Sequence, residues 1–168
     1  MRLQFLVHLP HETDHNITVW AEQRDHTVAR TQVFKGDEFP SLDDFDWLMI
    51  MGGFQSAWED EIYPWLTGEK RFILQALKHD KIVLGICFGA QLLAEVLGGR
   101  AFSNKHQEIG WHEVSLTPQG KKSFLFKKAP DPFRTFLWHS DHFSLPSGCA
   151  SLAFSEASPH QAFISRTY

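Results

Sequence analysis

Short apolar runs alternate with helical patterns over the first hundred residues. Apolar runs at 3–9, 47–51 and 81–86 are bounded by turn-forming residues, which predicts three short strands, the latter two buried on both faces. Alternating β-branched residues predict a further strand over 27–34. Helical spacing of apolar residues predicts helices over about 16–25, from Pro64 onward, and over 90–97, where a Gly-Gly pair ends the pattern.

The alternation of strand and helix up to residue 99 predicts an α/β fold. Its three layers would be a mostly parallel central sheet with helices on both faces. From Arg100 onward the pattern changes to short expected strands at 113–116, 135–138, 150–154 and 161–164, with prolines between them. We therefore expect one domain over residues 1–168, richer in β-structure toward its end.

Composition and charge exclude several classes of protein. The 168 residues carry 16 basic and 20 acidic side chains, and a net charge of −4 gives no general attraction for nucleic acid or an anionic membrane. No apolar run approaches the ~20 residues of a membrane span, and no secretory signal is present, so we expect a cytoplasmic protein. Histidines and cysteines lack metal-ligand spacing and the glycine pairs are not phosphate loops, so no metal or cofactor is predicted.

The strongest chemical signal is the pentapeptide 85–89, which reads Gly-Ile-Cys-Phe-Gly. It places Cys87 between two glycines where an expected strand meets an expected helix, which is the spacing of a nucleophile elbow. The dipole of the following helix would stabilise the thiolate over the thiol, and the N–H of Phe88 would face an oxyanion. The alternative interpretation is that Cys87 is a small buried apolar residue at a tight turn.

The surrounding sequence resembles the class I, triad-type glutamine amidotransferases, most closely stand-alone relatives of the amidotransferase domain of GMP synthase. The resemblance covers nearly the whole chain in the right order. It rests on the elbow with Ala90 to Ala94 after it, the apolar run ending in Gly52-Gly53, and four further segments at 64–66, 108–111, 138–141 and 161–163. It implies the flavodoxin-like fold of these amidotransferases.

The resemblance also implies a reaction and a set of residues. Cys87 would attack the side-chain amide of L-glutamine, forming a thioester and releasing ammonia to an unknown synthase partner. The N–H groups of Gly53 and Phe88 would form the oxyanion hole. The substrate glutamine would be held by Gly52 and Gln91 and by two residues of a glutamine-binding loop, Ser140 and Asp141. Read without the resemblance, Gln91 is a solvated residue in the first turn of a helix, and Ser140 and Asp141 are an ordinary turn pair.

Two positions depart from the family pattern. Phe54 follows Gly52-Gly53 where the family often has proline, which permits a looser turn. No His-x-Glu follows Gln161-Ala162-Phe163, although the family takes its catalytic base and the orienting carboxylate from that motif. We therefore expect a domain truncated at its C-terminus, with weak or no glutaminase activity. An exposed sheet edge would favour a homodimer.

Two alternatives to an amidotransferase remain open. A γ-glutamyl peptide hydrolase would share the elbow and release glutamate from a γ-linked substrate. A non-catalytic binding or regulatory module would keep the fold without the chemistry, and the missing His-x-Glu supports this alternative.

Overall fold

The computed structural model describes residues 1–10 and 14–165. The chain divides into two compact units, an N-terminal unit (Met1–Val96) and a C-terminal unit (Leu97–Tyr168). Each unit contains its own four-stranded sheet.

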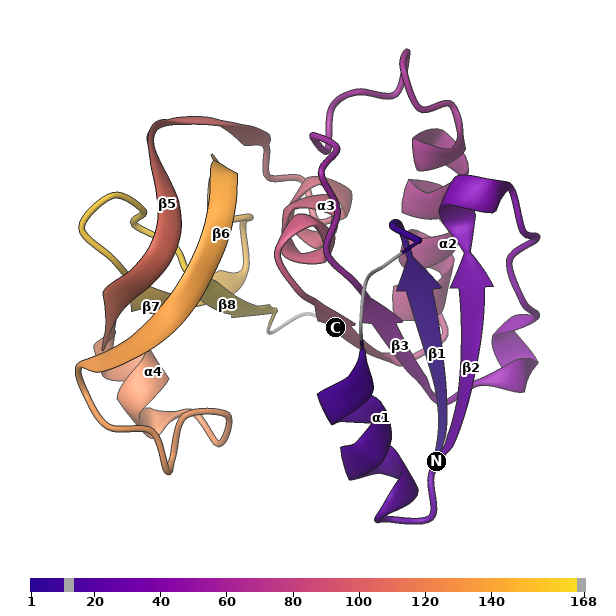
Figure 1. Cartoon of the computed structure of the whole chain (residues 1–168), viewed down its shortest axis with the longest axis horizontal. Coiled ribbons are helices and arrows are strands. Elements are labelled where there is room, and N and C mark those ends of the chain that lie inside the picture. Colours follow the sequence, from indigo (N-terminus) through magenta and orange to yellow (C-terminus); the bar gives the residue numbers. More distant parts are fainter. Residues whose placement is uncertain (11–13, 166–168) are drawn as a thin grey trace. The chain divides into compact units, whose positions relative to one another are not determined.

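The N-terminal unit is an α/β layer structure around a parallel sheet (Figure 1). Its strands pair in the order β2-β1-β3-β4, all parallel. The elements in chain order are β1 (Arg2–Val7), α1 (His15–Glu22), β2 (Thr27–Gln32), the 3₁₀ turns η1 (Val33–Lys35) and η2 (Leu42–Asp44), β3 (Trp47–Ile50), α2 (Trp65–Lys78), β4 (Ile82–Gly85) and α3 (Phe88–Val96). This arrangement confirms the predicted α/β fold.

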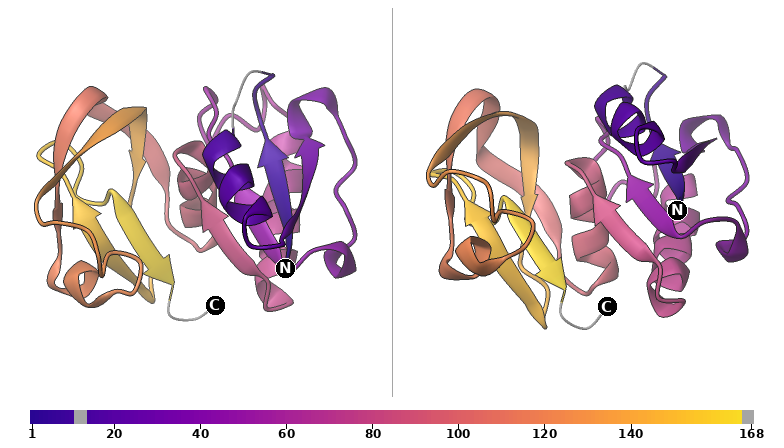
Figure 2. Two further views of the ribbon diagram at one scale, coloured as in Figure 1. Left: turned by 60° about the horizontal axis from the view of Figure 1, so that its bottom comes forward. Right: turned by 90° about the horizontal axis from the view of Figure 1, so that it is seen from below.

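Helices cover both faces of this parallel sheet, as the two views of Figure 2 show. On one face, Leu3 and Phe5 of β1 and Met49 of β3 form a buried cluster with Ala21 of α1. The opposite face carries α2 and α3, whose buried apolar residues include Ile73 and Leu92. The continuous apolar run of β3 is therefore explained, because a strand between two helical layers is buried on both sides.

The prediction that the strand at 81–86 is buried on both faces is wrong. Strand β4 lies at the edge of the parallel sheet, and its exposed fractions reach 49% for Ile82 and 37% for Leu84. Both side chains share a face with Met49 and Leu3, as the strand register requires, yet the apolar cluster around Ala21 of α1 contains residues of β1, β2 and β3 and none of β4. An apolar run alone does not distinguish a central strand from an edge strand.

Two smaller boundaries also differ from expectation. The second strand ends at Gln32 rather than at residue 34, because Val33 starts a 3₁₀ turn that Gly36 closes at a φ of 80°. Helix α1 begins at His15, after Asp14, and no side chain caps its first turn. Neither difference changes the path of the sheet.

The C-terminal unit is an antiparallel sheet with one short helix. Its elements are β5 (Ala101–Leu116), α4 (Pro118–Lys122), β6 (Phe133–Phe143), β7 (Cys149–Phe154) and β8 (Ala162–Ser165), and the strands pair in the order β6-β5-β7-β8. Its small core contains Val114, Leu116 and Ala153. Strands β5 and β6 are much longer than predicted. β5 carries many polar residues, and the residues of β6 alternate between partly buried and exposed, so neither strand has the apolar pattern of a buried strand.

Candidate functional site

Cys87 lies at a strained turn between β4 and α3. Its φ is 55°, in the left-handed region that residues with a side chain seldom adopt. The carbonyl of Cys87 accepts hydrogen bonds from the N–H groups of Ala90 (2.9 Å) and Gln91 (3.2 Å), so α3 begins directly at the turn. The Cys87 residue is exposed. The alternative of a buried apolar cysteine is therefore wrong, and the geometry is that of a nucleophile elbow.

The two glycines of the elbow are required by close backbone contacts. A Cβ on Gly85 would lie 2.3 Å from the carbonyl oxygen of Gly89. A Cβ on Gly89 would lie 2.1 Å from the carbonyl oxygen of Ile50, in the neighbouring strand β3. Any side chain at either position would therefore force the backbone to move, and with it Cys87.

The Gly52-Gly53 turn follows β3 at the same end of the sheet as the elbow, because β3 and β4 are parallel neighbours. The N–H of Ile86 donates to the carbonyl of Ile50 (2.9 Å), which ties the two strand ends together. A Cβ on Gly53 would lie 3.1 Å from the ring of Phe88 and 2.5 Å from Oε1 of Gln55. The structure thus brings Gly53 against Phe88, the two residues predicted to supply oxyanion donors.

Gln91 lies on the buried side of α3, one turn after the elbow. Only 6% of its surface is exposed, so the alternative of a solvated polar residue is wrong. A buried amide needs hydrogen-bond partners, and Gln91 is placed for a structural or binding role beside the elbow. Its contact with substrate stays a prediction.

Ser140 and Asp141 belong to the C-terminal unit and lie within strand β6, so the expectation of a loop or turn is wrong. The ladder with β5 is irregular here. Asp141 pairs with Ser103 and His139 pairs with Glu108, so residues 104–107 of β5 bulge opposite Ser140. A bulge next to a strand residue re-aims its side chain and is common at functional sites.

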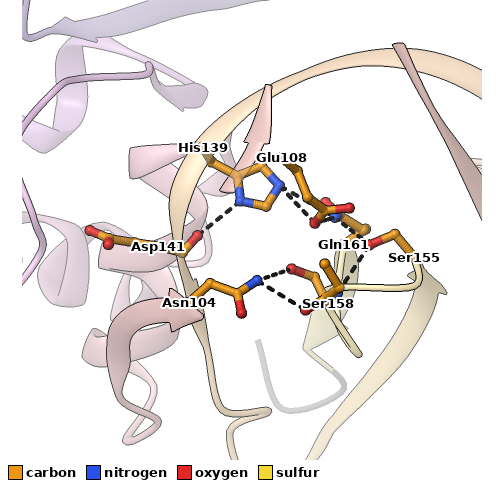
Figure 3. A network of polar contacts seen from close by, with 8 residues as sticks. Asn104, Glu108, His139, Asp141, Ser155, Ser158 and Gln161 are labelled. Atoms are coloured by element: carbon orange, nitrogen blue, oxygen red, sulfur yellow. Dashed lines mark hydrogen bonds and ion pairs between the residues drawn. The ribbon is translucent and has the colours of Figure 1, made fainter. Parts of the chain in front are cut away.

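A polar network fixes the strand around this bulge (Figure 3). Nδ1 of His139 donates to the carbonyl oxygen of Asp141 (3.0 Å), and Nε2 of His139 lies 3.4 Å from Oε2 of Glu108. The side-chain nitrogen of Gln161 donates to the same Glu108 oxygen (2.6 Å) and to Oγ of Ser155 (3.0 Å). The segments 108–111, 138–141 and 161–163, noted separately in the sequence, therefore meet in one network.

The second cysteine, Cys149, lies in a different environment. It is the first residue of β7 and is partly buried. Burial raises the pKa of its thiol, although a hydrogen bond with Ser165 acts in the opposite direction. Among residues 1–10 and 14–165, no cluster of three or more His, Cys, Asp or Glu side chains is arranged to hold a metal ion.

One buried pair near the elbow was missed at the level of sequence. His8 follows β1 and Glu69 lies on α2, and Nε2 of His8 is 2.8 Å from Oε1 of Glu69 with both side chains fully buried. Glu69 follows Leu66 by three positions and precedes Ile73 by four, so it stands on the apolar face of the predicted helix. A charged residue on that face was the signal that could have revealed the pair.

Comparison with known proteins agrees with the geometry of the elbow. The profile of the Glutamine amidotransferase class-I family matches residues 6–168. The chain belongs to this family. Its sequence is 34% identical over 165 residues to the glutamine amidotransferase-like protein YfeJ of Salmonella typhimurium, which covers 96% of the chain and 69% of YfeJ. It is 32% identical over 111 residues to the GMP synthase [glutamine-hydrolyzing] of Petrotoga mobilis, covering 66% of the chain and 20% of that synthase.

Solved amidotransferase structures share the fold. A glutamine amidotransferase from Thermotoga maritima superimposes with a TM-score of 0.92 at 30% identity, over 98% of this chain and 71% of that one. The glutamine amidotransferase of Methylobacillus flagellatus gives a TM-score of 0.89 at 26% identity, over 98% and 66% of the two chains. The class I amidotransferase fold is thereby confirmed.

No helix in the described residues is long and apolar enough for a membrane span.

Proposed function

We propose that this amidotransferase uses Cys87 to take the γ-glutamyl group from L-glutamine. The observation that carries the proposal is the elbow itself. An exposed cysteine with a φ of 55° opens helix α3, at the sheet end where Gly53 packs against Phe88. The first turn of a helix has N–H groups without partners in the helix, and the positive end of its dipole favours a thiolate there.

In the proposed reaction, the Cys87 thiolate attacks the side-chain carbonyl carbon of glutamine and forms a C–S bond. The carbonyl oxygen gains negative charge, which the N–H groups of Gly53 and Phe88 stabilise. Collapse of this intermediate restores the C=O bond and breaks the C–N bond, and the nitrogen takes up a proton and leaves as ammonia. Water then hydrolyses the thioester, releasing glutamate and the thiolate.

The remaining roles belong to binding and to the fate of ammonia. As the resemblance implies, Gly52, Gln91, Ser140 and Asp141 would bind the substrate. A separate synthase would accept the ammonia. In support, the Petrotoga relative is by its name a GMP synthase that hydrolyses glutamine. Neither Cys87 nor Cys149 forms a disulfide, which is consistent with a thiol nucleophile in a reducing compartment.

We further propose that residues 1–168 turn glutamine over slowly. Residues 1–168 contain no His-x-Glu after Gln161-Ala162-Phe163, so these residues by themselves do not supply Cys87 with a base of that kind. Loss of a triad member in other enzymes leaves a residual rate that comes from binding and the oxyanion hole.

The proposal is tested by trapping the acyl group. The protein is incubated with glutamine and hydroxylamine, and γ-glutamyl hydroxamate is measured over hours. We expect slow formation by the wild type, no formation above background by Cys87→Ser, and an unchanged rate in the matched variant Cys149→Ser. A γ-glutamyl peptide serves as an alternative acyl donor.

Each other outcome contradicts part of the proposal. Equal hydroxamate formation by Cys87→Ser would show that Cys87 is not the nucleophile. Transfer from the γ-glutamyl peptide but not from glutamine would favour the peptide hydrolase. No transfer from either donor would overturn the catalytic proposal and favour a non-catalytic module.

A further inference from the structure

A buried histidine–carboxylate pair contacts the Gly52-Gly53 turn. Nδ1 of His8 is 2.9 Å from the carbonyl oxygen of Gly52, and Nε2 of His8 is 2.8 Å from Oε1 of Glu69. The side chains of His8 and Glu69 are 0% exposed. All of these residues belong to the N-terminal unit.

The protonation of the ring follows from its partners. A carbonyl oxygen can only accept a hydrogen bond, so Nδ1 of His8 carries a proton and donates it to Gly52. The short contact between Nε2 and Glu69 then requires one proton between these two atoms, either on the ring or on the carboxyl group. In both cases Nδ1 remains a donor, and the hydrogen bond to Gly52 is kept.

This hydrogen bond fixes the direction of a second group. The carbonyl of Gly52 and the N–H of Gly53 belong to the same planar peptide unit and point in opposite directions. A peptide unit between two glycines rotates more freely than any other, because neither residue has a Cβ. By holding the carbonyl, His8 therefore holds the N–H that faces the proposed oxyanion.

The imidazole is itself held on its other sides. Its ring stacks on Trp65 at a centroid distance of 5.7 Å, with an angle of 20° between the planes. It also meets the ring of Phe88 edge to face at 4.9 Å, and the same Phe88 ring borders Gly53. His8 thus contacts Phe88 directly and holds the carbonyl of Gly52, which belongs to the same peptide unit as the Gly53 N–H.

We propose that His8, oriented by Glu69, is a positioning residue that sets the direction of the Gly53 N–H for glutamine chemistry at Cys87. The inference rests on the proposed function. If the pair served stability alone, its replacement would change stability and not the reactivity of Cys87. A buried ion pair replaced by apolar side chains of similar size often leaves a protein equally stable. The two roles are therefore separable in a variant that folds.

The test compares two reagents on Cys87 in a Cys149→Ser background. A chloro-ketone analogue of glutamine carries a carbonyl for the oxyanion hole, and the thiolate displaces its chloride to form a C–S bond. Iodoacetamide alkylates the same sulfur without using the pocket. Rate constants with both reagents are measured by mass spectrometry for wild type, His8→Leu/Glu69→Leu, Glu69→Leu and Glu69→Gln, with urea unfolding of each variant as the control for folding.

Loss of the anchor should be specific to the glutamine analogue. In His8→Leu/Glu69→Leu we expect the chloro-ketone rate to fall at least about tenfold, while the iodoacetamide rate changes by less than about twofold. Glu69→Gln should recover most of the rate that Glu69→Leu loses, because an amide still offers Nε2 of His8 a hydrogen bond. An unchanged ratio of the two rates in the folded double variant would overturn the inference.

A second pair of variants decides the question if the leucine variants do not fold. In a Glu69→Gln background, the amide nitrogen of His8→Asn takes the place of Nδ1 and can donate to Gly52, whereas the longer side chain of His8→Gln reaches toward residue 69. We expect the chloro-ketone to label Cys87 at least about tenfold faster in the His8→Asn variant than in the His8→Gln variant. Equal rates would overturn the inference.

Failure of the proposed function would look different. If glutamine did not protect wild-type Cys87 from the chloro-ketone, the pocket itself would be absent, and both proposals would fall. If glutamine protected the wild type and the variants labelled equally fast, only the role of His8 would be wrong.

Discussion

The two cysteines of this chain show how the surrounding backbone decides what a thiol can do. Cys87 follows a parallel strand, has a φ of 55° and opens helix α3 in an exposed position. Cys149 begins an antiparallel strand, is partly buried and has a thiol pKa raised by that burial. A helix N-terminus stabilises a thiolate, and burial opposes it, so we expect the thiolate to be favoured at Cys87 and disfavoured at Cys149.

The two sheets also differ in what holds them together. In the N-terminal unit, helices on both faces leave β3 buried, and both β3 and β4 end at one edge where the turns are tight. In the C-terminal unit, the long ribbon of β5 and β6 is half exposed and depends on a polar network around Glu108. We therefore expect substitutions to act through backbone packing in the first unit and through hydrogen bonds and charge in the second.

The largest effect is expected at the elbow, from Gly89→Ala. The new Cβ would lie 2.1 Å from the carbonyl oxygen of Ile50, and backbone atoms cannot move away cheaply. We expect the free energy of unfolding in urea to fall by about 3 kcal/mol, with loss of glutamine-protected labelling of Cys87.

Gly68→Ala is the matched control, because Gly68 lies inside α2 and its nearest contact to an added Cβ is 3.6 Å. This variant should be more stable than the wild type by about 0.5–1 kcal/mol. Equal stability of the two variants would show that the elbow is not tightly packed.

A smaller effect is expected in the polar network, from Gln161→Ala. The substitution removes the donor that lies 2.6 Å from Glu108, whose surface is only 2% exposed. Glu108 would keep only the longer contact with His139 (3.4 Å), and the loss of a hydrogen bond to a buried carboxylate costs about 1–3 kcal/mol, which urea unfolding would detect. The exposed Gln107 provides the control, since Gln107→Ala should change stability by less than about 0.5 kcal/mol. If Gln161→Ala lost no more stability than Gln107→Ala, the network would not be needed for stability.

The smallest effect is a pH dependence of stability from His142. Burial lowers the pKa of this histidine below its ordinary value of 6.5, the nearby His139 and His160 lower it further, and Glu108 and Asp141 oppose the shift. The unfolded chain therefore binds a proton at higher pH than the folded chain, and stability falls as the pH drops below 6.5. His142→Phe, which keeps the edge-to-face contact with Phe102, should lose less stability between about pH 7.5 and pH 5.5.

Unfolding curves at both pH values check this prediction, with the exposed His106→Gln as the comparison. A pH dependence identical in His142→Phe and wild type would contradict it.

Local features of the sequence were enough to predict the N-terminal sheet and the elbow. A continuous apolar run predicts β3 because burial on both faces leaves no polar alternation, and two glycines around Cys87 predict a tight turn because only they permit the close backbone approach. The edge position of β4 was not predictable in this way, since the order of strands in a sheet depends on pairing between distant segments.

Long-range contacts account for the rest of what the sequence did not reveal. His8 and Glu69 are 61 positions apart, and only the fold shows that they contact each other and that His8 contacts the carbonyl of Gly52. The family resemblance placed Ser140 in a loop, yet the pairing of His139 and Asp141 with β5 holds it in a strand. The family resemblance supplied a role for Ser140 but none for His8 or Glu69.

The role of Cys87 as nucleophile is tested most directly by comparing the reactivity of the two cysteines of one molecule. The wild-type protein is treated with the chloro-ketone analogue of glutamine and, separately, with iodoacetamide, with and without excess glutamine, and each cysteine is quantified by peptide mass spectrometry. We predict rapid chloro-ketone labelling of Cys87 that glutamine suppresses, and slow labelling of Cys149 that glutamine leaves unchanged. Equal labelling of Cys87 and Cys149, indifferent to glutamine, would contradict it.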